Sequence, residues 1–477
     1  MTRLSRATLG QVPGNVAAPR DRAVPRIGMV HFGASAFHRA HQAAFVDAVL
    51  DHDPRWGIAA VSLRTRTAVD ALARQDGLYT LVIRDRKPAY RILGAHQAFL
   101  GPEDAEATAG LLASADVGLV TTTVTEKGYC LAADGTLDRD HPDVRRDLGG
   151  ATVPASVIGW IVRGLAARRD AGLAPFVVMP CDNLPSNGRK LHAALADFAR
   201  ATDAGLADWI TGELRVPGTM VDSITPASDE ALYADVRATI GLEDRAAVQR
   251  EAFAQWVIED VGPIGPDLAG AGAIVTTDVA GWEKTKLRIL NGAHSTLAYA
   301  GLLRGHETVA DAMADAPLAR FVEAMIREEI IPILPPVAGL DLQAYAGDVL
   351  QRFRNPGIVH RLDQIAQDGS QKLPYRLGDT LAANLERGRV PGRVVAAFGC
   401  WIAFLMRRAR AGVAIADPAG AALAGAAAEG SAAAVIDRVA GLGAGLPPAL
   451  RDHPALPRAA ERAFASDWDD LLRPDRG

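Results

Sequence analysis

The 477-residue chain has few cysteines and no long apolar run. Its three cysteines, Cys130, Cys181 and Cys400, are too few and too scattered for a disulfide framework or a zinc knuckle, and an odd number is typical of a reducing compartment. No window holds about 18 uncharged apolar residues, and the basic N-terminal stretch lacks the apolar core of a signal peptide. These absences predict a cytoplasmic protein that does not span a membrane.

An excess of charge of one sign is also missing. The chain has 51 basic residues (Lys and Arg) and 56 acidic residues, with no run of either sign. This balance offers no electrostatic footprint for nucleic acid or for an anionic membrane surface. With 49% hydrophobic residues, the chain has enough apolar material for two or three folded domains.

Lysine is scarce, because only six of the 51 basic residues are lysines. An arginine side chain is almost never deprotonated in a protein, whereas burial and neighbouring charge can tune a lysine into an acid or a base. The lysines are therefore candidates for proton transfer. The alternative is that they are simply the few lysines that remain in a composition that favours arginine. They are Lys87, Lys127, Lys190, Lys284, Lys286 and Lys372.

The two halves of the chain differ in their patterns. In the first half, short apolar segments alternate with helical periodicity, which predicts a largely parallel sheet with helices on both faces. In the second half, helical periodicity runs almost without interruption. We therefore predict a Rossmann-like α/β domain over residues 1–280 and a mainly α-helical domain over 281–477. The predicted strands are 27–32, 57–63, 78–85, 118–124 and 175–180; the helical stretches are 283–304, 306–331, 340–368, 376–410 and an Ala/Gly-rich region at 409–447.

The turn after the first predicted strand is a candidate nucleotide site. A dinucleotide-binding turn uses glycines for the bend, for close approach to the pyrophosphate and for helix packing, and here only Gly33 is present. Ser35 is small enough for a close approach and has a hydroxyl to donate. An ordinary strand-to-helix turn explains the same residues. The nearby His31, His38 and His41 lack a Glu or Cys at metal-ligand spacing, so we predict hydrogen bonding rather than a metal.

Two further segments carry groups suited to proton transfer and charge stabilisation. On an α-helix Lys286, Asn291 and His294 would lie at about 0°, 140° and 80°, which places an amine, an amide and an imidazole on one arc. Asn183 follows the apolar segment 175–180, at the end of a strand where α/β proteins bind ligands. A solvated polar helix face and a helix cap are the structural alternatives for these segments.

Together these segments resemble the mannitol dehydrogenase family of long-chain, zinc-independent polyol and hexuronate dehydrogenases. The matching stretches, which cover most of the chain in order, are FHRAHQA (37–43), VTEKGYC (124–130), CDNLPSNG (181–188), MVDSITP (220–226), QWVIED (255–260), KLRILNGAHSTLAYAG (286–301), RNPGIVHR (354–361) and DGSQKLP (368–374). The resemblance implies a Rossmann-like domain, a helical domain and an active site in the cleft between them. It implies an enzyme that acts on a secondary alcohol of a small sugar acid or polyol, as a monomer or small homo-oligomer.

The resemblance also implies roles for individual residues. Lys286 resembles the catalytic acid/base, Asn183 and Asn291 the pair that polarises the reacting oxygen, and His294 the residue that orients the substrate. Asp222, Lys372 and Arg361 are expected in the substrate pocket, and no metal is expected. The residues expected to contact NAD are Phe32, Gly33, Ala34, Ser35, Ala36, Phe37, His38, Arg39 and Thr123.

Within the family, TEKGYC and DGSQKLP look more like fructuronate reductases (D-mannonate oxidoreductases) than like mannitol, arabinitol or sorbitol dehydrogenases, which remain the alternative. A hexuronate pocket needs a cation for the carboxylate, and Lys372 and Arg361 are the candidates, ahead of Lys127. A sensor that binds nucleotide or sugar without turnover is a further alternative, but the intact Lys286, Asn291 and His294 favour an enzyme.

The chain departs from the family pattern at three places. Ser35 stands where a second glycine is usual, and Ser223 stands where arginine is common. After the second strand, Arg64 and Arg66 replace the acidic residue that would hold a ribose 2′-hydroxyl, and an arginine there suits a 2′-phosphate. NAD is the expected cofactor by resemblance, with NADP as the alternative.

Overall fold

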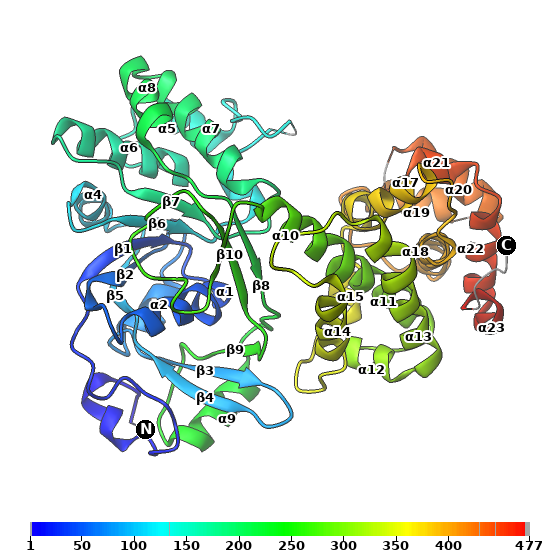
Figure 1. The fold of residues 1–477 in the computed structure, drawn as a ribbon, viewed down its shortest axis with the longest axis horizontal. Coiled ribbons are helices and arrows are strands. Elements are labelled where there is room, and N and C mark those ends of the chain that lie inside the picture. Colours follow the sequence, from blue (N-terminus) through cyan, green and yellow to red (C-terminus); the bar gives the residue numbers. More distant parts are fainter. Residues whose placement is uncertain (1, 133, 429, 444, 473–477) are drawn as a thin grey trace. The chain divides into compact units, whose positions relative to one another are not determined.

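The computed structural model describes residues 2–132, 134–428, 430–443 and 445–472. The chain forms two compact units, Met1–Val279 and Ala280–Gly477 (Figure 1). The first contains every strand of the described residues, and the second is built from helices. This confirms the predicted fold class, an α/β Rossmann-like unit followed by a mainly helical one.

A five-stranded parallel sheet forms the centre of the first unit. Its strands lie in the order β5 (His96–Leu100), β2 (Gly57–Val61), β1 (Ile27–Phe32), β6 (Leu119–Thr122) and β7 (Val177–Pro180). From β1 the chain moves outward through β2 to β5, and then crosses to the other side of β1 for β6 and β7. The order therefore reverses between β1 and β6, and in open α/β sheets ligands bind at the carboxyl ends of the strands at such a point.

The sheet is buried on both faces because alternate side chains of each strand point in opposite directions. Val30 and Phe32 lie in one apolar core, and Met29, which precedes Val30 and points to the opposite face, lies in another. The first core is shared with α4, α6 and α7, and the second with α2. These helices are α2 (Gln42–Val49), α4 (Ala105–Ala113), α6 (Val157–Asp170) and α7 (Asn187–Arg200).

The predicted strand at 78–85 is present but does not belong to the parallel sheet. It forms β3 (Tyr79–Arg84), which pairs antiparallel with β4 (Ala89–Leu93) and parallel with β9 (Val248–Glu251). The connection between β3 and β4 is short enough for a hairpin, so β3 pairs with its sequence neighbour. A further sheet has the order β11 (Ile274–Thr276), β10 (Gln255–Glu259) and β8 (Thr219–Asp222).

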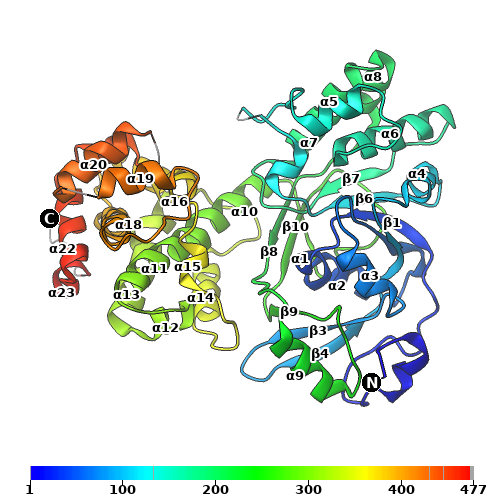
Figure 2. The ribbon, with the colours of Figure 1, turned by 180° about the vertical axis from the view of Figure 1, so that it is seen from behind.

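The second unit is organised around α18 (Gly392–Arg410), which is apolar and almost wholly buried from Val394 to Met406. It packs against α11 (Gly292–Leu303) and α22 (Ala455–Ala465) (Figure 1, Figure 2). None of the described helices has both the length and the apolar character needed to cross a membrane.

The helical stretches of this unit are shorter than the predicted ones. The stretch 340–368 is divided into α14 (Leu342–Phe353), α15 (Leu362–Ile365) and the connection between them. Three π-helical segments also occur in the described part of the unit, η4 (Lys286–Asn291), η5 (Met325–Ile330) and η7 (Pro374–Gly378). Because a π turn hydrogen-bonds over five residues instead of four, each segment changes the helical phase of the side chains that follow it.

Candidate functional site

In the first unit, the switch point between β1 and β6 is built around Gly33. This glycine has φ +98°, and an added Cβ would lie 2.5 Å from the carbonyl oxygen of Thr123. The Thr123 hydroxyl donates to the Gly33 carbonyl oxygen at 2.6 Å. The turns after β1 and β6 are thus held against each other. Gly33 has a backbone conformation that only glycine adopts without strain.

A cavity of about 430 Å³ opens at this point. Residues that follow β1, β2 and β6 line it, as expected for a nucleotide that lies across the carboxyl ends of these strands. Phe32 and Gly33 were predicted from the sequence to contact a cofactor, whereas the part formed by His141 and residues 155–157 carries no recognisable turn motif. The lining residues are Phe32, Gly33, Ser62, Leu63, Arg64, Val124, Thr125, Lys127, Gly128, His141, Asp143, Ala155, Ser156 and Val157.

The rest of the predicted turn begins a short helix. Ser35 caps α1 (Ala36–Ala40), and its hydroxyl accepts from the His38 N–H at 3.1 Å. Ala34 is buried and Phe37 packs against the second core of the sheet. The Arg39 guanidinium is directed into the protein, where Nη1 donates to the Ala34 carbonyl oxygen at 2.8 Å. Ser35, which stands where a second glycine was expected, therefore caps the N-terminus of α1 by accepting a backbone hydrogen bond.

The three clustered histidines have separate hydrogen-bond partners. His31 contacts Thr121 and Thr123 through its two ring nitrogens, at 2.7 and 2.9 Å. His38 stacks on His31, with ring centroids 3.4 Å apart, and its Nε2 lies 3.0 Å from Nε2 of His96. His41 contacts the Gln255 carbonyl oxygen.

Burial keeps the imidazoles of His31, His38 and His96 neutral. It lowers the pKa of His31 and of His96 to about 3, and it lowers the pKa of His38 well below the ordinary value, with further contributions from His31 and His96. These three rings are therefore an uncharged part of the packing beneath the turn that contains Gly33.

The two arginines after β2 differ in their surroundings. Arg66 is held by three carboxylates, those of Asp70, Glu103 and Asp104, at 2.8, 2.5 and 2.6 Å. Arg64 lines the cavity and pairs with Asp143 at 2.8 Å, but 76% of its side chain is exposed. Arg64 is thus the arginine of this pair that can reach a ligand.

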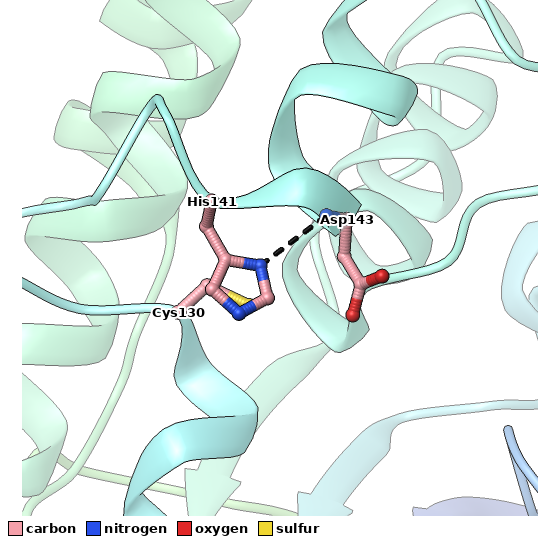
Figure 3. A group of neighbouring side chains, drawn as sticks. All are labelled: Cys130, His141 and Asp143. Carbon is pink, nitrogen blue, oxygen red and sulfur yellow. Dashed lines mark hydrogen bonds between the residues drawn. The ribbon is translucent and has the colours of Figure 1, made fainter.

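One group of metal-ligating types lies at the edge of the same cavity and was not predicted from the sequence. One ligand atom from each of Cys130, His141 and Asp143 lies within 4.8 Å of the other two (Figure 3). Nδ1 of His141 accepts from the Asp143 N–H, and the Asp143 carboxylate accepts from Arg64. Burial, together with nearby carboxylates, raises the pKa of the Cys130 thiol to about 11, so the sulfur is protonated at neutral pH.

We expect chelators to leave turnover unchanged, because the three groups already have protein partners and the thiol is not in the thiolate form that binds zinc. The measurement is activity after dialysis against EDTA and 1,10-phenanthroline, with the metal content determined on the same samples. Loss of activity that added zinc restores would contradict this expectation and identify Cys130, His141 and Asp143 as the metal ligands.

Two predicted site residues of the first unit lie at strand ends. Asn183 is exposed and lies three residues beyond the end of β7. Its neighbour Asp182 accepts a hydrogen bond from the buried Tyr129 hydroxyl, which anchors the loop. Asp222 is the last residue of β8 and is buried. Ser223, where the family commonly has arginine, donates to the Phe253 carbonyl oxygen at 2.9 Å.

In the second unit, Lys286 and Asn291 are the first and last residues of the π-helical segment η4. The α-helical spacing of 140° therefore does not apply. Because a π turn joins residues five apart by a hydrogen bond, it brings their side chains toward one face of the helix. Lys286 is 8% exposed, and Asn291 is half-buried with no hydrogen-bond partner for its amide among the described residues.

His294 lies one turn further on, in α11, and is surrounded by aromatic rings. Its centroid lies 4.4 Å from that of Phe353 and 4.9 Å from that of His360. Burial lowers the pKa of His294 well below the ordinary value, with further lowering by His360, Arg376 and Arg352, and burial lowers the pKa of His360 to about 4. Both rings are neutral at physiological pH, so the His294 ring can offer a ligand a hydrogen bond but no charge.

The two cations predicted for a substrate carboxylate lie in different surroundings. Arg361 is half-exposed and pairs with Asp363 at 3.0 Å. Lys372, in α16 (Gly369–Leu373), donates to the Gln367 carbonyl oxygen at 2.8 Å and lies 3.4 Å from Asp368. Sequence reasoning missed Arg376 in η7, whose Nη1 donates to the Ser295 hydroxyl at 3.2 Å. Its only sequence signal was its place two residues after DGSQKLP.

The first unit has a parallel sheet with a cavity at its switch point, and the second carries a buried lysine, an amide and a neutral imidazole close together in sequence. This combination is typical of a dehydrogenase-type oxidoreductase. The family description "Mannitol dehydrogenase Rossmann domain" matches residues 27–268, and "Mannitol dehydrogenase C-terminal domain" matches residues 278–446. The chain belongs to the mannitol dehydrogenase family.

Characterised proteins of this family resemble the chain over most of its length. It is 41% identical to the D-mannonate oxidoreductase of Escherichia coli K12 over 76% of each chain, and 35% identical to the polyol:NADP oxidoreductase of Gluconobacter oxydans over 85% of this chain and 86% of that protein. Among solved structures, the ternary complex of Pseudomonas fluorescens mannitol 2-dehydrogenase with NAD and D-mannitol matches with a TM-score of 0.84, 33% identity and 98% of each chain.

Proposed function

We propose that this protein is a cytoplasmic, NAD-dependent hexuronate reductase that interconverts D-fructuronate and D-mannonate. The observation that carries the proposal is the 41% identity to the D-mannonate oxidoreductase over three quarters of both chains. The basic side chains of the helical unit support it, because a sugar acid, unlike a neutral ketose, brings a carboxylate that needs a cation.

The residues at the switch point fit a dinucleotide. Gly33 allows the turn after β1 to lie against Thr123, where a Cβ would collide with the carbonyl oxygen, and the cavity beside this turn continues past Ser62 and Arg64, where the ribose of a dinucleotide is expected. When bound, the cofactor supplies the redox chemistry, since its reduced nicotinamide gives a hydride to the ketone carbon. The protein contributes the positions of the reactants and the transfer of the proton.

Lys286 is proposed as the acid/base. In the direction of ketone reduction, the Lys286 Nζ gives a proton to the ketone oxygen, which becomes the new hydroxyl. In the direction of alcohol oxidation the same amine takes up that proton. A lysine serves here where an arginine would not, because the guanidinium does not release its proton at physiological pH.

Hydrogen-bond donors are proposed to stabilise the charge on the reacting oxygen. The amide of Asn291 has no hydrogen-bond partner among the described residues. Its position at the end of η4, five residues after Lys286, brings the two side chains toward the same face of this π-helical segment. By the resemblance to the family, Asn183 is the second donor. His294, being neutral, orients a substrate hydroxyl by hydrogen bonding, and Asp222 and Lys372 contact further hydroxyls.

A polyol dehydrogenase is the second candidate function. It is favoured by the structural likeness to the mannitol 2-dehydrogenase, whose complex holds NAD and D-mannitol, at 33% identity. The two candidates use the same proton transfer and differ in the recognition of the end of the substrate. The exposed Arg64 and the polyol:NADP relative make NADPH a necessary arm of any test.

We expect fructuronate to be reduced with a kcat/KM about 10- to 100-fold higher than that for fructose, because a charge-assisted contact to a partly desolvated carboxylate is worth about 1.5–3 kcal/mol. The measurement is a steady-state matrix of fructuronate, tagaturonate, fructose and xylulose with NADH and with NADPH. Equal or better activity on fructose would contradict the hexuronate assignment and support the polyol dehydrogenase.

A further inference from the structure

The second unit contains a shielded guanidinium with no acidic partner. The Arg376 Nη1 donates to the Ser295 hydroxyl at 3.2 Å, and this is its one side-chain hydrogen bond among the described residues. Its Nε is shielded from solvent and has no acceptor. No carboxylate oxygen in the described ranges lies within 4.0 Å of its nitrogens, so the donors left over can take a bidentate anion.

Other cations of this unit already have oxygen partners. Arg361 pairs with Asp363 at the surface, and Lys372 is held by the Gln367 carbonyl oxygen and by Asp368. Arg288, on η4, lies 3.9 Å from the Asp379 carboxylate. A shielded cation without such a partner is costly to the folded protein, and this cost is offset if a ligand brings the missing anion.

Arg376 lies beside the residues proposed for proton transfer. Its segment η7 packs against η4, which carries Lys286 and Asn291, and its carbonyl oxygen would lie 3.1 Å from a Cβ added at Gly292. The Ser295 that accepts its hydrogen bond is next to His294. Since His294 and His360 are neutral, the positive charges that act on the His294 imidazole are those of Arg376 and Arg352.

We propose that Arg376 binds the substrate carboxylate and determines the preference for sugar acids over neutral ketoses. This inference rests on the proposed function, because only a hexuronate brings the carboxylate. A planar guanidinium with Nε and Nη2 available matches the two oxygens of a carboxylate, whereas a lysine offers only a point charge.

The test compares R376Q with the unmodified enzyme on fructuronate and on fructose. We expect the ratio of kcat/KM for fructuronate to that for fructose to fall about 10- to 100-fold, mainly through a higher KM for fructuronate. R376K, which keeps the positive charge but loses the planar pair of N–H donors, is expected to give an intermediate ratio. R320Q, a substitution of an exposed arginine on α13 (Ala316–Ala324), is the matched control and should keep the original ratio.

Failure of the proposed function and failure of this inference give different results. If the unmodified enzyme does not prefer fructuronate, the proposed function is wrong, and the assignment of Arg376 is overturned with it. If the preference exists but R376Q loses both substrates equally, Arg376 only supports the structure, and the inference alone is overturned. R361Q and K372M are included, because loss of the preference in either of these, with R376Q unaffected, would assign the carboxylate to that residue.

A folding defect in R376Q is detected by thermal unfolding and circular dichroism. In that case R376K decides, together with calorimetric titration of D-mannonate and mannitol into this variant. An affinity for mannonate that falls at least about threefold relative to that for mannitol supports the inference, and an unchanged ratio overturns it.

Discussion

Replacement of Lys286 by arginine is expected to lower kcat by at least about two orders of magnitude. The variant keeps a cation at this position but has no proton that it can release near neutral pH, so the proton-transfer step loses its acid/base. The effect should be similar in both directions of the reaction. The measurement is kcat and kcat/KM for ketone reduction and alcohol oxidation, together with their pH profiles.

Because Lys286 is buried, the larger arginine side chain also tests the packing. The fluorescence titration of NADH and the thermal unfolding of K286R therefore serve as controls, and both are expected to stay close to those of the unmodified protein. K284R is the matched variant, since Lys284 belongs to α10 (Val279–Thr285) and has no role in the proposed chemistry. A near-normal rate for K286R would remove Lys286 as the acid/base.

Replacement of Asn291 by alanine is expected to lower kcat by about 10- to 1000-fold. A donor aimed at an oxygen that gains charge in the transition state acts on turnover, and its loss changes the affinity for the cofactor much less. Asn183→Ala is expected to behave in the same way. Stopped-flow hydride transfer and the Kd of NADH, measured on the same preparations, separate the two effects.

The matched control is Asn384→Ala, in the same unit as Asn291. The Asn384 amide donates to the carbonyl oxygens of Glu329 and Thr380, at 2.8 and 2.9 Å, so its loss should lower the unfolding temperature and spare the rate per folded enzyme. If Asn291→Ala behaved like Asn384→Ala, or lowered only the affinity for NADH, the assignment of Asn291 to the reacting oxygen would be wrong.

The strands of the nucleotide unit were predictable because their apolar segments are local patterns. β1 lies at 27–32 as predicted, and the strands at 57–61, 119–122 and 177–180 lie inside the predicted ranges. One exception is β3, whose sequence is as apolar as that of its neighbours but which pairs in a hairpin with β4. Another is β5, the edge strand of the parallel sheet, which was not predicted. The choice of partner strand depends on contacts between distant residues, which periodicity does not contain.

The candidate site was predictable only in part. The motif containing Lys286, Asn291 and His294 was found from the sequence, but its helical phase was calculated for an α-helix, and η4 is a π segment. Packing against η7 accompanies this change, as does the approach of Gly292 to the Arg376 carbonyl oxygen. Neither contact leaves a signal in the local sequence.

The sequence by itself determined the class of fold, and it supplied the candidates for the nucleotide turn and for proton transfer, since these depend on local periodicity and short motifs. Only the tertiary structure decided which charged groups already have partners. Arg361 and Arg66 meet carboxylates, whereas Arg376 meets a serine hydroxyl. The reason is physical, because the interaction of a charge depends on distance and burial, and both are set by segments that meet only when the chain has folded.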